Sequence, residues 1–247
     1  MAAKKNDAQE SIVFHDLTGD PENYDYENIT PKYRVLEQSQ ESICGTDQRI
    51  KVTATTAMPY KAICKIYMKA ANGRNFIGTG WLTHANKLYT AGHCVYDEGE
   101  GGWMESIIVV PAMSGSNDPY GRYTASAALA TNGWINDQSQ RYDMGAIKLS
   151  SNVSHSDFIL PTLSDSNSCT VCGYPGDRDT GIFQYRMNDS VRASGGRHFY
   201  QIDTFGGQSG APLLSNGSTS IGIHNYGGCD NSGSDLYQKF IDAVDGW

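Results

Sequence analysis

Short apolar runs separated by Gly, Asn, Asp and Pro dominate the chain from Lys51 onward. Runs of this length, bounded by turn residues, are typical of β-strands. We predict eight of them as strands, at residues 62–68, 76–82, 106–110, 146–149, 170–172, 198–202, 211–214 and 220–223. Many short strands with turn signals between them predict an all-β sandwich or barrel.

The two ends of the chain depart from this pattern. Near the C-terminus, apolar residues recur at helical spacing, at Leu236, Tyr237, Phe240, Ile241 and Val244. We therefore predict a C-terminal helix that packs on the second half of the molecule, with Ser234 as its N-cap. Residues 1–41 are polar and only weakly periodic, which is typical of a tail.

The net charge of the 247-residue chain is −8, and residues 1–41 account for −5 of it. An acidic chain of this kind is a poor nucleic-acid ligand, so we expect no nucleic-acid partner. No apolar run is long enough to span a bilayer, and the N-terminus lacks the hydrophobic segment of an intact secretory signal. Either a signal was removed or secretion is absent. The six cysteines are compatible with three disulfides and an oxidising compartment.

Three motifs carry candidate chemistry. Ser209 lies in the glycine-rich stretch 206–212, His93 follows the strand-like run 87–89, and Asp143 precedes the strand-like run 146–149. Singly, these residues are typical of a turn, a structural histidine and a cap. Together they occur in the order His, Asp, Ser, which is one of the orders that serine-protease triads use.

This combination predicts nucleophilic catalysis. Ser209 would be the nucleophile, because a serine hydroxyl attacks only with an adjacent base to take its proton. His93 would be that base, and Asp143 would hold the imidazole in the required tautomer. The backbone N–H groups of Gly207 and Ser209 would form the oxyanion hole.

From residue 42 almost to the C-terminus, the chain resembles the glutamyl endopeptidases, the glutamate-specific branch of the chymotrypsin-like serine proteases. The resemblance rests on motifs at 43–49, 59–63, 79–82, 91–96, 142–147, 173–177, 202–210 and 222–225. It implies a chymotrypsin-like double six-stranded β-barrel with a C-terminal helix. It also implies a secreted serine endopeptidase, made as a zymogen, that cleaves after Glu and less readily after Asp.

The resemblance divides the chain into three parts. Residues 1–41 would be a propeptide-like activation segment, and residues 42–155 an N-terminal barrel carrying His93 and Asp143. Residues 156–247 would be a C-terminal barrel carrying Ser209, with the join between 150 and 161. Ser42 matches the first residue of mature relatives and follows Glu41, so we expect the enzyme to cleave its own Glu41–Ser42 bond.

Specificity has two competing interpretations. Thr204 and His224 match pocket residues of the resembled family, with Asn225 and Tyr226 beside them as further substrate-binding candidates. The α-amine of a free Ser42 would help to neutralise the substrate glutamate, because Gln208 offers that amine no charged partner. Alternatively, Asp203 occupies the position that selects Lys or Arg in trypsin-like enzymes.

The cysteines depart from the family pattern. The usual partner position of Cys94 is occupied by Gly78, so we favour a Cys64–Cys94 bond instead. A Cys44–Cys229 bond is sensible if the mature N-terminus reaches the pocket. Cys169 and Cys172 form a C-x-x-C pair, which fits a redox pair, half a zinc site, a small structural loop or free thiols, and we favour the last two.

Protein or peptide substrates are the expected partners of a monomer, and no cofactor or catalytic metal is expected. Some relatives bind structural calcium, but no compact ligand loop occurs in this sequence. A catalytically silent, peptide-binding relative is a further alternative. The complete set of His93, Asp143 and Ser209 argues against that alternative.

Overall fold

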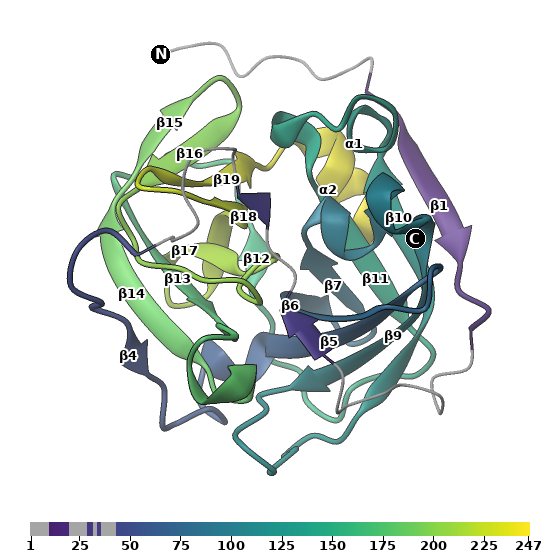
Figure 1. Cartoon of the computed structure of the whole chain (residues 1–247), viewed down its shortest axis with the longest axis horizontal. Helices are drawn as coiled ribbons and strands as arrows, with labels where there is room; N and C mark the ends of the chain where they lie inside the picture. Colours follow the sequence, from purple (N-terminus) through teal and green to yellow (C-terminus); the bar gives the residue numbers. More distant parts are fainter. Residues whose placement is uncertain (1–9, 20–28, 32–33, 36–42) are drawn as a thin grey trace.

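The computed structural model describes residues 10–19, 29–31, 34–35 and 43–247. These residues form two sheets in which most strand pairs are antiparallel, one sheet of nine strands and one of ten (Figure 1). The predicted processing site at Glu41 and Ser42 lies outside the described residues. Within the described part, no helix is both long and apolar enough to cross a membrane.

The first sheet closes into a six-stranded barrel, because β9 pairs with both β5 and β10. The ring consists of β5 (Ile63–Ala70), β6 (Asn75–His84), β7 (Lys87–Thr90), β11 (Gly145–Leu149), β10 (Tyr123–Thr131) and β9 (Gly102–Pro111). Three shorter strands lie outside the ring. These are β1 (Ile12–Asp16) on β10, β2 (Ile29–Pro31) on β6 and β8 (Tyr96–Asp97) on β9.

The second sheet has a corresponding run of six strands. In spatial order these are β14 (Tyr185–Ser190), β13 (Ser168–Gly173), β17 (Pro212–Asn216), β18 (Thr219–Gly227), β19 (Asn231–Asp235) and β16 (Arg197–Tyr200). Four short strands extend this sheet: β4 (Ile50–Lys51) on β14, β15 (Arg192–Ser194) on β16, and both β12 (Leu160–Pro161) and β3 (Arg34–Val35) on β18.

The all-β double-barrel prediction is confirmed, and all eight predicted strands fall on observed ones. The first barrel encloses a core that includes the fully buried Trp81 and Leu88. The strands that the apolar run pattern missed include β10, which is rich in alanine, and β19, whose sequence NSGSD contains no apolar side chain. Such strands bury small side chains between neighbours, so they carry no hydrophobic signal.

The C-terminal helix is present but begins later than predicted. Helix α2 spans Gln238–Asp245 with Tyr237 as its N-cap, whereas Ser234 belongs to β19. The helix packs on the first barrel, not the second as predicted: its Phe240 ring lies 5.4 Å from that of Tyr89 on β7. The Nζ of Lys87, also on β7, donates hydrogen bonds to the last-turn carbonyls of α2. A lysine there satisfies carbonyls that have no partner within the helix.

Candidate active site

His93 and Asp143 come together at one end of the first barrel. His93 lies in the short helix η3 (Gly92–Cys94) after β7, and Asp143 follows η5 (Gln140–Tyr142) just before β11. The ring Nδ1 of His93 lies 2.8 Å from Oδ2 of Asp143, and the His93 backbone N–H donates to Oδ1 over 2.8 Å. A Cβ at residue 92 would lie 2.9 Å from Oδ1, so this approach requires Gly92.

Both members of this pair are fully buried, and their electrostatics are coupled. Burial opposes the charged form of His93, but the adjacent Asp143 carboxylate outweighs burial and raises the pKa of the imidazole. Burial likewise opposes the carboxylate, but the charge of His93 and its hydrogen bonds lower the pKa of Asp143. The other ring nitrogen, Nε2 of His93, is buried and has no hydrogen-bond partner within residues 10–19, 29–31, 34–35 and 43–247. This is the atom that must receive the serine proton in a triad.

Ser209 lies in the tight loop that leads into β17. Its carbonyl accepts a hydrogen bond from the Thr79 N–H on β6 over 2.9 Å, which ties the loop to the first barrel. Gly207 has a φ of +102°, and a Cβ there would lie 2.4 Å from the Tyr174 carbonyl oxygen. Only glycine fits that conformation and that contact.

The loop also orients the two amides predicted for the oxyanion hole. The Gly206 carbonyl accepts from the Gly176 N–H over 2.7 Å, and the Gln208 carbonyl accepts from the Ala211 N–H over 2.9 Å. In a planar trans peptide, the C=O and the following N–H point in opposite directions. The N–H groups of residues 207 and 209 therefore point away from these partners.

Asn225 and Ser234 brace Asp143 from the second barrel, a role that sequence reasoning missed. The Asn225 amide Nδ2 donates to the Asp143 backbone carbonyl over 2.6 Å, and its Oδ1 accepts from the Ser234 N–H over 2.8 Å. The neighbouring Tyr226 has its ring 6.4 Å from that of His93, and its hydroxyl helps to lower the pKa of Asp143. The side chains of Asn225 and Tyr226, predicted to bind substrate, thus contact the His93–Asp143 pair.

The predicted pocket residue His224 has a partner that no sequence signal indicated. The Tyr200 hydroxyl lies 2.6 Å from Nδ1 of His224, and both side chains are buried. Burial, together with the nearby charge of His93, lowers the pKa of His224 to about 3. A neutral imidazole that accepts at Nδ1 carries its proton on Nε2. His224 is therefore held as an uncharged donor.

Thr204, the other predicted pocket residue, is fully buried. Its hydroxyl oxygen has no hydrogen-bond partner among the described residues. A buried hydroxyl without a partner costs about 1–3 kcal/mol of stability, so such groups are usually retained where a ligand satisfies them.

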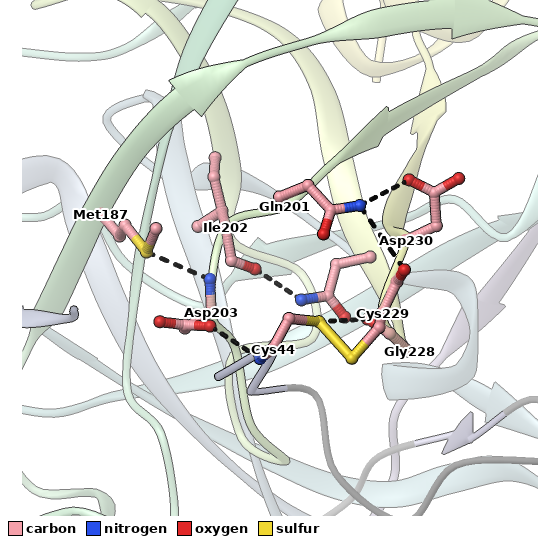
Figure 2. The surroundings of a disulfide bond; sticks show 9 residues. Cys44, Met187, Gln201, Ile202, Asp203, Gly228, Cys229 and Asp230 are labelled. Carbon is pink, nitrogen blue, oxygen red and sulfur yellow. Dashed lines mark hydrogen bonds between the residues drawn. A yellow bond between two sulfur atoms is a disulfide. The ribbon is translucent and has the colours of Figure 1, made fainter. Parts of the chain in front are cut away.

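Asp203 is the candidate residue for trypsin-like specificity, and each of its carboxylate oxygens accepts a backbone hydrogen bond. Its Oδ1 accepts from the Cys44 N–H over 3.0 Å and its Oδ2 from the Gln48 N–H over 2.9 Å. Cys44 is disulfide-bonded to Cys229, as predicted, and Figure 2 shows the bond beside the carboxylate. The segment that follows the predicted cleavage point is thus held to the second barrel by a covalent bond and by Asp203.

The other disulfide prediction is wrong. Cys64 and Cys94 are both free, buried thiols. Cys64 pairs in register with Gly80, whereas Gly78 is the residue beside the Cys94 sulfur, which would lie 3.1 Å from a Cβ at position 78. Cys64 is therefore two strand positions away from the site where a bond could form.

Cys169 and Cys172 are also free, buried thiols. They lie three residues apart on β13, so their side chains point to opposite faces of the strand. Cys169 packs in the small second core cluster and Cys172 in the large one. A redox pair or a shared metal would need both sulfurs on one face. Among the described residues, no three His, Cys, Asp or Glu side chains gather as metal ligands.

Comparison with known proteins places this geometry in a family. A family model described as Trypsin matches residues 51–246. A Bacillus subtilis protein named extracellular metalloprotease is 33% identical over 218 residues, which cover 83% of this chain and 69% of that protein. A glutamyl endopeptidase of Bacillus licheniformis is 32% identical over 227 residues, covering 85% of this chain and 70% of that protein.

A solved structure of a Glu endopeptidase superposes with a TM-score of 0.72 at 31% identity, covering 82% of this chain and 97% of that one. The protease Anisep of Arthrobacter nicotinovorans superposes with a TM-score of 0.64 at 24% identity, a likeness of fold. Fold, family model and relatives all agree. The chain belongs to the trypsin family of chymotrypsin-like proteins, and it is a serine endopeptidase.

Proposed function

We propose that this enzyme cleaves peptide bonds after glutamate, and less readily after aspartate. The observation that carries the proposal is the buried His224, held by Tyr200 as a neutral donor in the position that matches the pocket of glutamyl endopeptidases. The buried Thr204 hydroxyl, which has no partner in the part of the chain that the structure describes, supplies a second group for a substrate carboxylate. A carboxylate enters a buried site only where such donors replace its water.

The reaction would proceed through an acyl-enzyme. His93 takes the Ser209 proton through Nε2 as the hydroxyl oxygen attacks the scissile carbonyl, and it then protonates the leaving amine. Asp143 stabilises the imidazolium that forms, and its 2.8 Å bond to Nδ1 keeps the ring in place. The N–H groups of Gly207 and Ser209 hold the oxyanion, at roughly 3–4 kcal/mol per donor. A water molecule then attacks the acyl-enzyme while His93 takes its proton. The ester bond to Ser209 breaks, His93 returns the proton to Ser209, and the peptide acid leaves.

The arrangement of Asp203 counts against a trypsin-like preference for Lys and Arg. Both of its oxygens accept backbone N–H groups of the 44–48 segment, so the carboxylate is not presented to a basic side chain. Its place in the mechanism is indirect: it holds the segment that begins two residues after Ser42.

We also propose secretion and activation by cleavage at Glu41–Ser42. The Cys44–Cys229 bond supports an oxidising compartment. After cleavage, the new α-amine would sit two residues from an anchored Cys44, close enough to the second barrel to help neutralise a substrate glutamate. An α-amine has a pKa of about 8 and is mostly protonated at neutral pH.

The test is a digest of a denatured, unrelated protein by the mature enzyme, with the cut sites identified by mass spectrometry. Cuts after Glu are expected, and Ser209→Ala should lose them by several orders of magnitude. N-terminal sequencing of the active enzyme should begin at Ser42. Cuts after Lys and Arg would overturn the proposal and would identify Asp203 as the residue that determines specificity.

A further inference from the structure

Two strands of the N-terminal segment lie on the edges that border the active site. β3 pairs with β18 at Tyr226 and Gly227, directly after His224 and Asn225. β2 pairs with β6 at residues 75–77, just before Thr79, which contacts the Ser209 and Gly207 carbonyls. Residues 29–31 therefore pair beside the strand that contacts the Ser209 loop, and residues 34–35 pair beside the strand that carries His224.

The candidate catalytic and pocket side chains are buried in this chain. Ser209 has 3% of its surface exposed and His93 has none. Thr204 and His224 are buried to the same degree. An extended substrate must lie beside these groups, along the strand edges that β2 and β3 occupy in this chain.

The chain direction from β2 to β3 is opposite to the direction expected for a bound substrate. In the proposed function, the side chain before the scissile bond enters the pocket of His224, so the N-terminal half of a substrate lies along β18. The C-terminal half, which leaves first, must then extend toward β6. A substrate therefore runs from β18 to β6, whereas this segment runs from β6 at residues 29–31 to β18 at residues 34–35.

We propose that the edges of β6 and β18 form a docking surface for a peptide strand that runs opposite to a substrate, and that β2 and β3 of this chain are its occupants. The inference rests on the proposed function for the direction of the substrate. Main-chain pairing with exposed strand edges supplies the affinity. Residues 29–31 and 34–35 occupy edges along which the two halves of a substrate would pair, so their docking competes with substrate binding.

Occupancy is tested by labelling Ser209 with a small fluorophosphonate in a chain kept uncut by Glu37→Gln and Glu41→Gln. Such a probe needs His93 and Ser209 but not the glutamate pocket. Arg34→Pro with Val35→Pro removes both N–H groups of β3 and should raise the labelling rate at least tenfold. The matched control, Val13→Pro with Phe14→Pro, unpairs β1 from β10 and should leave the rate unchanged. Equal rates in the two variants would overturn the inference.

Direction is tested without catalysis, in a Ser209→Ala chain. Val35 and Gly227 are register partners, so Val35→Cys with Gly227→Cys should form a disulfide under mild oxidation. Ile29→Cys with Gly227→Cys, the pair that a substrate-like direction would favour, should remain reduced. The opposite result overturns the reversed docking even if the mature enzyme cleaves after Glu. Conversely, cleavage after Lys and Arg with the expected crosslink would overturn the proposed specificity and leave the docking intact.

Discussion

The Tyr200 hydroxyl lies 2.6 Å from Nδ1 of His224, and when the hydroxyl donates there the pocket histidine carries its proton on Nε2. Removing the hydroxyl with Tyr200→Phe frees His224 to adopt the other tautomer. We expect KM for glutamate substrates to rise about tenfold with kcat nearly unchanged, the effect of losing one hydrogen bond of about 1.4 kcal/mol. Steady-state kinetics on a peptide series measures this. Tyr89→Phe is the control, because the Tyr89 hydroxyl is buried in the first barrel and has no described hydrogen-bond partner. An equal rise in KM for Tyr89→Phe would contradict the role given to the Tyr200 hydroxyl.

Asp203 holds the 44–48 segment through two backbone N–H groups. Replacing it with asparagine keeps one acceptor and turns the other oxygen into a donor that faces an N–H. We expect Asp203→Asn to lower kcat/KM for glutamate substrates about tenfold, from the loss of one charge-assisted bond. Neither form should cleave after Lys or Arg. Asp165 is exposed, and Asp165→Asn removes the same charge away from the site. We expect it to leave kcat/KM for glutamate substrates unchanged. If the wild type cleaves after Lys or Arg and Asp203→Asn does not, Asp203 is instead the residue that selects basic side chains.

Asn225 supports Asp143 by donating to its carbonyl, and it also satisfies the Ser234 N–H. Asn225→Ala removes the partner of the Ser234 N–H and leaves the Asp143 carbonyl only the 3.4 Å bond from the Ser234 hydroxyl. We expect kcat to fall between about 10- and 100-fold, equivalent to roughly 1–3 kcal/mol, with little change in KM. Asn188→Ala is the matched control, because Asn188 also donates to a backbone carbonyl but lies on β14. A change confined to KM would mean that Asn225 acts on the substrate rather than on Asp143.

His224 should make the folded protein sensitive to mild acid. Its pKa is about 3 when folded and about 6.5 when unfolded, so between these values the unfolded chain binds more protons. Stability must therefore fall as pH drops below about 6.5, by up to about 1.4 kcal/mol per pH unit from this group. His224→Gln should flatten the dependence. Urea unfolding at pH values from about 6.5 down to about 4.5 measures it, with His15→Gln on β1 as control. Identical slopes for wild type and His224→Gln would refute the assignment.

The strands and the candidate triad could be predicted because their signals are local. Each predicted strand is an apolar run bounded by turn residues, and Gly92 and Gly207 mark places where the backbone itself must approach a neighbour. The order of His93, Asp143 and Ser209 along the chain then suggested one reaction. The same reasoning failed for β19 and for the start of α2, because NSGSD resembles a turn in sequence and becomes a strand only between β16 and β18.

The sequence by itself determined the fold class, the family motifs and the residues that could carry the chemistry. Only the tertiary structure decided what those residues contact. Tyr200 and His224 are 24 residues apart, and Asp203 meets a segment more than 150 residues earlier in the chain. Register on β5 and β6 likewise separates Cys64 from Cys94. Hydrogen bonds and disulfides depend on ångström-scale distances between strands, which the periodicity of a single strand does not encode.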